Sequence, residues 1–280
     1  MSINIVRRKF GAIPSPVDVR DYRFSKKAKS IASQMHFPEN FHLTLRHVKD
    51  QGSVASCVAH AIAESIEYFN YTQVEDDEEM SVGYIYGNRM NSQYFGTGMC
   101  PRDALENAVK YGDVKKLDFY DNAEIPDIIK TFEKKFPVLQ DKGKPYAITS
   151  YIRINKESEI KKALMENGPV IVSMRWYKDF TLDINNTLHS QFNESDGCGY
   201  HCMVIFGWNK NGWKILNSWG KDFGYNGTFT YPYNYPVCEL WSVMDTNTDN
   251  SDIVKPMSGK FWKWLVKIIN TIINWIIHKK

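Results

Sequence analysis

The pattern of hydrophobic and polar positions changes character near the middle of the chain. In the first half, apolar residues recur every three or four positions, which is the spacing of an amphipathic helix. This pattern predicts helices over 57–71, 81–90 and 101–110. In the second half, short β-branched and aromatic runs bounded by turn residues predict strands. These runs cover 146–154, 170–174, 202–208, 212–217, 229–233 and 240–244, with a helix over 156–166 between the first two.

A helical half followed by a β half restricts the possible architecture. The runs 202–208 and 212–217 flank the polar turn Asn209-Lys210-Asn211, so they predict an antiparallel hairpin. Antiparallel strands that follow a block of helices are typical of segregated rather than alternating elements. We therefore predict an α+β fold with a helical lobe and a β lobe that meet at a cleft.

Segments at both ends fall outside this pattern. The first 36 residues are basic, contain Pro14 and Pro16 and have no long apolar period, which predicts an irregular arm. A polar stretch follows the last predicted strand and indicates a linker. The expected division is an arm over 1–36, a domain over 37–245 with lobes of about 37–145 and 146–245, a linker over 246–260 and a helix over 261–280.

The C-terminal helix is strongly amphipathic. Its stretch 261–277 is rich in Trp and Ile but carries Lys263 and Lys267, which makes it marginal for crossing a bilayer. Tryptophans on the apolar face and lysines on the polar stripe favour a helix that lies in a membrane interface. Packing on its own domain or on a second copy fits the same pattern. We therefore expect a membrane surface or a partner helix as a binding partner.

Composition narrows the functional class. The chain has 280 residues, 43% of them hydrophobic, and a formal net charge of +3, which describes a globular protein without the charge excess of a nucleic-acid binder. Five cysteines occur without a CxxC pair, so we expect no metal and no cofactor. The N-terminus lacks the apolar run of a signal peptide, so synthesis in the cytoplasm is expected.

Cys57 is the first candidate for chemistry. It follows the Gly/Ser-containing turn 50–56 and begins the first predicted helix, where free backbone N–H groups and the helix dipole favour a thiolate. A lone cysteine in such a helix is more often a buried core residue, so a nucleophile needs partners. His201 lies at the start of one hairpin strand and Asn217 at the end of the other, which brings the imidazole and the amide together. The amide oxygen can then orient the ring that accepts the thiol proton.

The spacing and surroundings of these residues resemble a known family. Cys57 and His201 are 144 residues apart and His201 and Asn217 are 16 apart, which is typical of papain-type enzymes. The blocks Gln51-Gly52-Ser53-x-x-Ser56-Cys57, Gly199-Tyr200-His201 and Asn217-Ser218-Trp219-Gly220 resemble the Cys, His and Asn blocks of papain-like cysteine peptidases. The stretch 102–112 is similar to the non-secreted bacterial and viral branch. The resemblance covers about residues 37–245.

This resemblance implies a cysteine endopeptidase with a papain-like fold, in which a helical lobe and a β-barrel-like lobe enclose the active site. It implies that Cys57, His201 and Asn217 form the catalytic triad and that the Gln51 amide joins the Cys57 N–H as an oxyanion hole. Trp219 would shield the His–Asn hydrogen bond, and Gly98 and Met99 would contact an extended polypeptide substrate. We also expect residues between 10 and 30 to contact the cleft as a short prosegment.

Some features leave alternatives open. Val54, Ala55 and Val58 stand where secreted members usually have Cys, Gly and Trp, so substrate preference is not predicted. A Cys198–Cys238 disulfide remains an open alternative to free thiols. The same triad also suits an isopeptidase or amide transferase, and a catalytically silent binding module would retain the fold. Richness in Lys, Asn, Ile and Tyr is typical of an AT-rich genome, such as that of a large DNA virus, so a virion is a further expected location.

Overall fold

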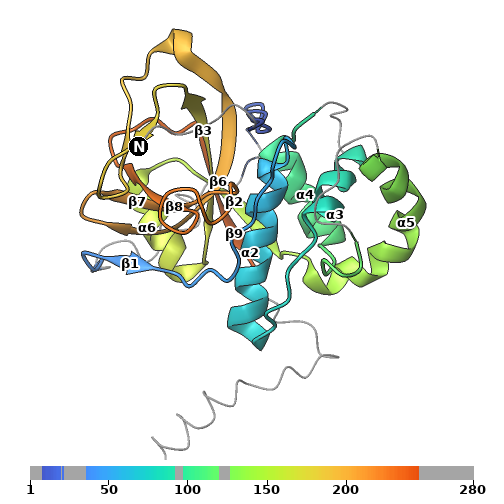
Figure 1. The fold of residues 1–280 in the computed structure, drawn as a ribbon. Helices are drawn as coiled ribbons and strands as arrows, with labels where there is room; N and C mark the ends of the chain where they lie inside the picture. Colours follow the sequence, from blue (N-terminus) through green and yellow to red (C-terminus); the bar gives the residue numbers. More distant parts are fainter. Residues whose placement is uncertain (1–7, 20, 22–35, 92–96, 120–126, 246–280) are drawn as a thin grey trace, which may run out of the picture.

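The computed structural model describes residues 8–19, 21, 36–91, 97–119 and 127–245, with the backbone alone at 90–91, 127–133 and 157. The predicted linker and helix over 246–280 lie outside the described residues. Helix α2 (Cys57–Val74) runs through the middle of the molecule, with the sheet on one side and the other helices of the first half on the other (Figure 1). In the described part of the chain, no helix is both long and apolar enough to cross a bilayer.

The helical lobe contains the elements that the periodicity predicts. They are α2, α3 (Val82–Gly87) with a following 3-10 turn (Asn88–Asn91), and α4 (Pro101–Tyr111). Helix α5 (Asp127–Gly143) and the short 3-10 turn Lys144–Tyr146 were not predicted. Pro137 lies inside α5, and a proline within a helical pattern ordinarily argues against a helix.

The second lobe is an antiparallel sheet in the order β2-β9-β3-β6-β7-β8, with β1 (Phe41–His42) paired to β6. Its strands are β2 (Ser150–Ile154), β3 (Val170–Tyr177), β6 (Gly197–Asn209), β7 (Gly212–Leu216), β8 (Thr228–Pro232) and β9 (Glu239–Met244). A separate pair, β4 (Thr181–Leu182) and β5 (Leu188–His189), lies beside it, with a 3-10 turn at Glu194–Asp196. Helix α6 (Glu157–Glu166) packs against β2, β3, β6 and β9. The predicted α+β architecture is confirmed.

The two largest of the three apolar cores in the described residues lie on opposite sides of the sheet. One core joins α2 to α4 and to the facing side of the sheet, and the other fills the opposite side of the sheet. Helix α2 is buried on most of its surface because the sheet and the helices α3 and α4 both pack on it. Cys57, at its first turn, therefore faces the strands of the second lobe.

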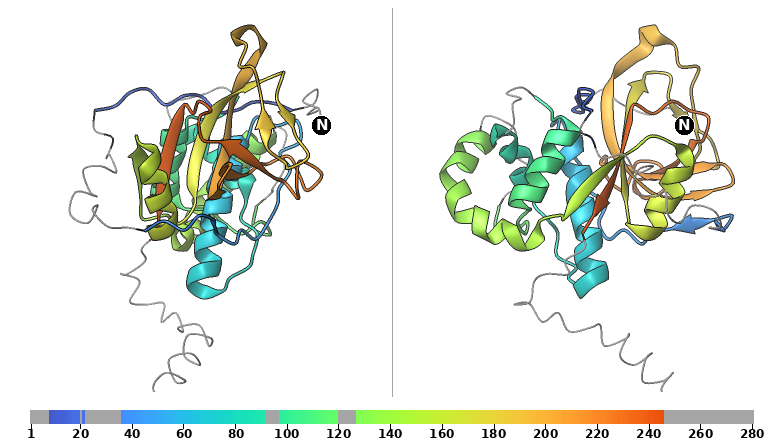
Figure 2. Two further views of the ribbon diagram at one scale, coloured as in Figure 1. Left: turned by 90° about the vertical axis from the view of Figure 1, so that its left-hand side faces the viewer. Right: turned by 180° about the vertical axis from the view of Figure 1, so that it is seen from behind.

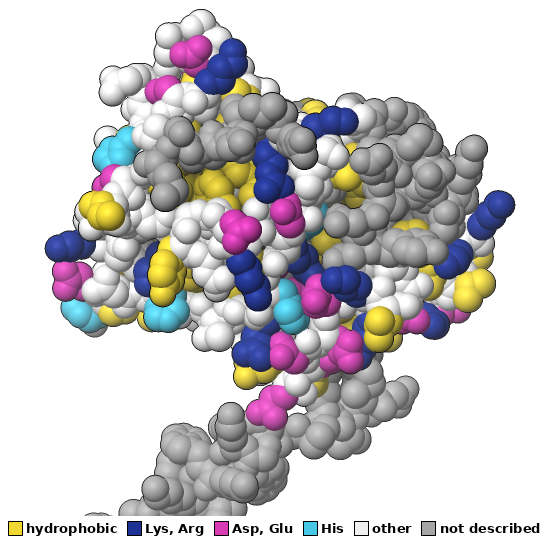
Figure 3. Space-filling model, viewed as in Figure 1, with side chains coloured by type: hydrophobic (Ala, Val, Ile, Leu, Met, Phe, Trp, Pro, Cys, Tyr) yellow, Lys and Arg dark blue, Asp and Glu magenta, His cyan; other side chains and the backbone are white. Residues whose placement is uncertain are grey.

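The described part of the arm crosses the junction between the lobes. Figure 2 shows this dark-blue segment at the end of the molecule where α2 begins. Ala12 forms bridges with Met99 on the helical side and with Tyr200 on the sheet side. In the described part of the arm, Ala12 therefore contacts residues of both lobes. Charged side chains of both signs are interspersed on the face in Figure 3, in keeping with the small net charge of +3.

Candidate active site

Cys57 occupies the first turn of α2 and is fully buried. Burial raises the pKa of its thiol, while nearby backbone N–H groups, those of Cys57 and Val58 at the helix start among them, act in the opposite direction. The N–H groups of Gly11 and Cys202 also lower the pKa. The sulfur therefore lies beside both the arm and the residue that follows His201.

His201 and Asn217 meet across the hairpin formed by β6 and β7. Asn217 Oδ1 lies 2.8 Å from His201 Nε2 and also accepts a 2.8 Å hydrogen bond from the Ser218 N–H. Because an amide oxygen only accepts, the proton of the neutral imidazole belongs on Nε2. His201 Nδ1 is buried and has no hydrogen-bond partner among the residues that the structure describes. This nitrogen is thus available to a thiol proton.

Aromatic rings enclose the imidazole. Trp219 stacks on His201 at 5.0 Å between ring centres, and Trp176 meets it edge-on at 5.5 Å. Phe10 of the arm covers a further side at 5.8 Å. Trp176 and Phe10 were not singled out in the sequence, because their relation to His201 depends on strand register and on the path of the arm. Met174, two positions before Trp176, is the strand partner of His201.

Gln51 connects the cysteine turn to the asparagine block. Its Nε2 donates to the carbonyl oxygens of Lys9 and Val54, both at 2.8 Å. Its Oε1 accepts a 2.7 Å hydrogen bond from the Ser218 hydroxyl, and the side chain is fully buried. The amide N–H₂ group of Gln51 therefore points toward the cleft, and there it donates to the Lys9 carbonyl oxygen of the arm.

The arm also occupies the region of Gly98 and Met99. The Met99 N–H donates to Gly11 O at 2.8 Å, and the Ile13 N–H donates to Met99 O at 2.9 Å. The Ala12 N–H donates to Tyr200 O at 3.1 Å on the opposite wall. Gly98 has a φ of +87°, and a Cβ there would lie 2.4 Å from Gly11 O. The arm thus passes between both walls in an extended conformation.

A charged group of the arm lies at the same end of the cleft. Arg8 forms an ion pair with Asp50, donates to the Trp219 carbonyl oxygen at 3.2 Å and lies over the Trp219 ring. Burial lowers the pKa of His201 to about 4, the Asn217 hydrogen bond opposes this, and the positive charges of His60 and then of Arg8 add to the lowering. The two pKa shifts are in the directions that favour the neutral thiol and the neutral imidazole.

This burial predicts a difference in pH dependence between the full chain and a chain that begins at residue 20. In the full chain, the raised pKa of Cys57 keeps the thiol protonated over about pH 5 to 8. We expect its alkylation by iodoacetamide to increase only above that range. The shortened chain exposes the pair, so its profile should reach half-maximum at lower pH. Rate-against-pH profiles of the two chains make the comparison, and coincident midpoints would contradict it.

All five cysteines are unbonded in the structure. Cys198 lies on β6, whereas Cys238 lies next to β9 and donates its N–H to Ser173 O of β3. Strand β3 lies between β6 and β9, which separates the two cysteines by about 10 Å. A disulfide allows about 7 Å between Cα atoms at most, so the fold keeps this pair as free thiols.

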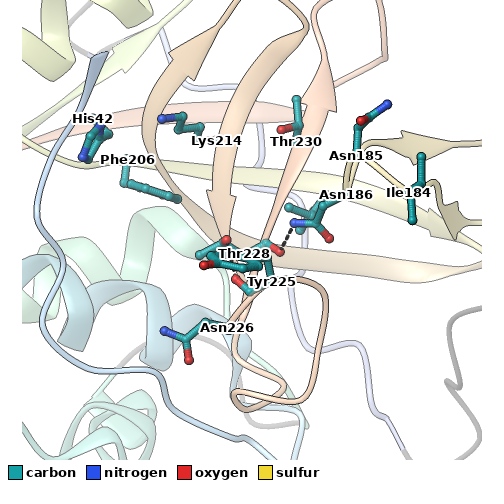
Figure 4. Close-up of a pocket in the computed structure, with 11 residues that line it drawn as sticks. His42, Ile184, Asn185, Asn186, Phe206, Lys214, Tyr225, Asn226, Thr228 and Thr230 are labelled. Atoms are coloured by element: carbon teal, nitrogen blue, oxygen red, sulfur yellow. Dashed lines mark hydrogen bonds between the residues drawn. The ribbon is translucent and has the colours of Figure 1, made fainter. Parts of the chain in front are cut away.

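A pocket elsewhere in the β lobe contains none of the candidate catalytic residues. It has a volume of about 520 Å³ and is lined by residues of β6, β7, β8 and neighbouring loops, among them Phe206, Lys214 and Thr230 (Figure 4). Asn186 closes one side by donating to the Thr228 carbonyl oxygen at 2.7 Å. The cleft between Met99 and Tyr200 is filled by the arm, so the open pocket and the candidate chemistry lie at different places.

The fold and the site together are those of a thiol hydrolase, with a cysteine at a helix start and an imidazole–amide pair on the opposite lobe. The family model described as papain family cysteine protease matches residues 34–247. The chain belongs to this family and is a cysteine peptidase of the papain type. The sequence-based expectations of family and enzyme class are thereby confirmed.

Viral proteins are among the relatives that this chain resembles. An uncharacterized peptidase C1-like protein of Acanthamoeba polyphaga mimivirus is 26% identical over 90% of this chain and 94% of its own length. The viral cathepsin of Adoxophyes honmai nucleopolyhedrovirus is 26% identical over 72% of this chain, and the chain spans 59% of that protein.

Solved structures agree on the fold. Xylellain, a cysteine protease from Xylella fastidiosa, matches with a TM-score of 0.70 at 23% identity, covering 85% of this chain and 97% of its own. Digestive procathepsin L 3 of Tenebrio molitor matches with a TM-score of 0.65 at 17% identity, covering 85% of this chain and 76% of its own. The predicted papain-like two-lobed fold is confirmed.

Proposed function

We propose that the chain is an endopeptidase that uses Cys57, His201 and Asn217, and that its N-terminal arm holds it inactive. The observation that carries the catalytic part is the 2.8 Å contact between His201 Nε2 and Asn217 Oδ1, which leaves Nδ1 without a hydrogen bond. A ring held in this tautomer accepts a proton on Nδ1, and we assign Cys57, whose sulfur lies near the backbone of the next residue, Cys202, as the donor of that proton.

The reaction follows from these groups. His201 Nδ1 takes the thiol proton of Cys57, and the sulfur attacks the carbonyl carbon of the scissile peptide bond. Gln51 Nε2 and the Cys57 N–H donate to the oxygen that becomes negative. His201 then protonates the leaving amine, which leaves a thioester. A water molecule, activated by transfer of its proton to His201, hydrolyses the thioester and regenerates the thiol.

The arm has the contacts of an inhibitor. Its Lys9 carbonyl oxygen accepts a hydrogen bond from the Gln51 amide, and its Gly11 N–H is near enough to the Cys57 sulfur to lower the pKa of the thiol. Phe10 packs on the imidazole, and the backbone of residues 11–13 bonds both walls. These contacts exclude a peptide substrate.

Alkylation by a peptidyl epoxide tests the proposal. A chain that begins at residue 20 should be labelled at Cys57 at least about 100-fold faster than the full chain and should hydrolyse internal bonds of an unfolded polypeptide. Cys57→Ala in the shortened chain is the control for the site of labelling. Thermal unfolding of the shortened chain shows whether it is folded. A folded chain that is neither labelled nor active would contradict the proposal and favour a silent binding module.

The products separate hydrolysis from the other chemistry that the triad suits. A peptidase releases a new free carboxylate for each new amine, whereas an amide transferase incorporates an added amine. Mass spectrometry of the products, with a primary amine added to the reaction, measures both. We expect free carboxylates from main-chain bonds. Exclusive cleavage of lysine side-chain amides would instead identify an isopeptidase.

A further inference from the structure

Asp21 of the arm is held by a pair of arginines beyond the catalytic residues. Arg102 donates from Nε to Oδ1 at 2.8 Å and from Nη2 to Oδ2 at 2.7 Å, which is a bidentate contact. Arg153 Nη1 donates to Oδ2 at 3.2 Å. The Asp21 side chain is 7% exposed, so the carboxylate is enclosed rather than placed on the surface. Charge-assisted bidentate contacts of this kind are strong and selective for carboxylates.

The domain, and not the arm, builds this carboxylate site. Arg102 belongs to the first turn of α4, and Arg153 belongs to β2, where it is the strand partner of Trp241. Both guanidinium groups lie over the Trp241 ring, at 5.7 Å for Arg102 and 5.2 Å for Arg153. Stacking on a buried ring fixes the orientation of both groups. Both arginines and the ring beneath them therefore belong to the peptidase domain.

A continuous line of contacts connects this site to the cleft. Arg102 follows Met99 by three positions, and Met99 pairs with the arm at Gly11 and Ile13. The Ser15 N–H then donates to Glu239 Oε1 at 3.2 Å, and the Ser15 hydroxyl accepts from the Arg102 N–H at 3.2 Å. A chain that lies along the Met99 wall is thus led directly to the arginines. A peptide that replaces the arm can follow the same path.

Departure of the arm leaves the arginine pair without the carboxylate that joins it. Arg102 and Arg153 are 12% and 20% exposed even with Asp21 present, so water reaches them only partly. The positive charges of Arg102 and Arg153 lie side by side and are largely shielded from water, so together they attract an anion strongly. Restoring a carboxylate recovers the charge-assisted hydrogen bonds that the arm makes.

We propose that Arg102, Arg153 and Trp241 form a carboxylate-binding subsite that selects peptide substrates with an Asp or Glu side chain on the Met99 side of the scissile bond. Asp21 is the built-in occupant of this subsite. The inference rests on the proposed function, because it requires a peptide to enter the cleft in place of the arm.

Peptide binding tests the subsite without relying on turnover. The protein is the full chain with Gly11→Ala and Asp21→Asn, which open the cleft and empty the subsite, and with Cys57→Ala, which prevents cleavage. Fluorescent peptides carry a single Asp or a single Asn at successive positions, and anisotropy gives their Kd. At one position the Asp peptide should bind about 10- to 100-fold more tightly than its Asn counterpart.

Substitutions of the arginine identify the subsite. Arg153→Gln should reduce the Asp preference to less than about threefold, and Arg153→Glu should transfer the preference to Lys. Arg46→Gln is the matched control, because Arg46 also makes a bidentate pair, with Asp77, and lies over a ring, that of Tyr71. It should retain the preference. Thermal unfolding identifies any variant that fails to fold. If an Arg153 variant does not fold, the same binding measurement is made with Arg102→Lys in its place.

The possible outcomes separate the two proposals. Equal binding of Asp and Asn peptides at every position, or a preference that survives Arg153→Gln, would overturn the subsite and leave Asp21 as a fastening for the arm alone. The same opened chain with Cys57 restored reports on the proposed function through epoxide labelling. Labelling without an acidic preference would therefore contradict the subsite only, and an acidic preference without labelling would contradict the catalytic proposal only.

Discussion

Alanine in place of His201 is expected to lower kcat/KM of the opened peptidase by at least about 10⁴-fold. The imidazole both takes the thiol proton and returns a proton to the leaving amine, so its loss removes both transfers. His201 is fully buried between Trp219 and Trp176. Hydrolysis of a fluorogenic peptide by the chain that begins at residue 20 measures the effect.

His189→Ala is the matched control for this substitution. His189 also pairs with a polar side chain, Asp183, but lies on β5 and is exposed. Its replacement should leave kcat/KM within about twofold. Epoxide titration gives the fraction of folded, accessible cysteine in each preparation. A His201→Ala chain that keeps more than a tenth of the activity per labelled site would show that another group acts as the base.

A single methyl group at position 11 is expected to release the arm. A Cβ on Gly11 would lie 2.0 Å from the Ala55 carbonyl oxygen and 2.4 Å from its carbon, and both are backbone atoms that cannot rotate away. The arm must move, and then the Met99 N–H loses its 2.8 Å contact with Gly11 O. A cost of about 3 kcal/mol raises the open population about 100-fold. Epoxide labelling of the full-length Gly11→Ala chain should increase by that factor.

Pro14→Ala provides the control, because Pro14 is also in the arm but is exposed. Its labelling rate should equal that of the unchanged chain. If Gly11→Ala is labelled as slowly as the unchanged chain, the arm can shift at this point without leaving the cleft. Inhibition would then not depend on close contact between Gly11 and Ala55. Labelling of both variants at the increased rate would instead mean that any change in the arm opens the cleft.

The helices and strands near the site could be predicted because their patterns are strong. Residues 57–71 place apolar side chains on nearly every turn, and α2 forms there because both lobes bury it. Helix α5 was missed because Pro137 interrupts the pattern, and such a helix depends on tertiary packing rather than on its own preference. Strand β6 begins at Gly197, earlier than predicted, because the glycines before Tyr200 carry no β signal.

The candidate site, like the fold, contains some residues that could be predicted from the sequence and others that could not. Cys57, His201 and Asn217 could be found because each stands at a predicted element boundary and their order is characteristic of a family. Trp176 could not, since its contact with His201 requires the register between β3 and β6. The pKa of Cys57 depends on burial as well as on its position in the helix. A helix N-terminus favours a thiolate, whereas burial raises the pKa of the thiol.

The covalent connection of the arm has a consequence for how inhibition depends on concentration. Residues 8–13 and the cleft belong to one chain, so the local concentration of the inhibitor is fixed by the tether and is typically about millimolar for such connections. Dilution therefore does not release it, unlike an inhibitor supplied by a second molecule. A competing peptide displaces the arm only when the ratio of its concentration to its Kd exceeds the same ratio for the tethered arm. A cut anywhere between Ile13 and Phe37 removes the tether, so the arm becomes an ordinary ligand that dilution removes.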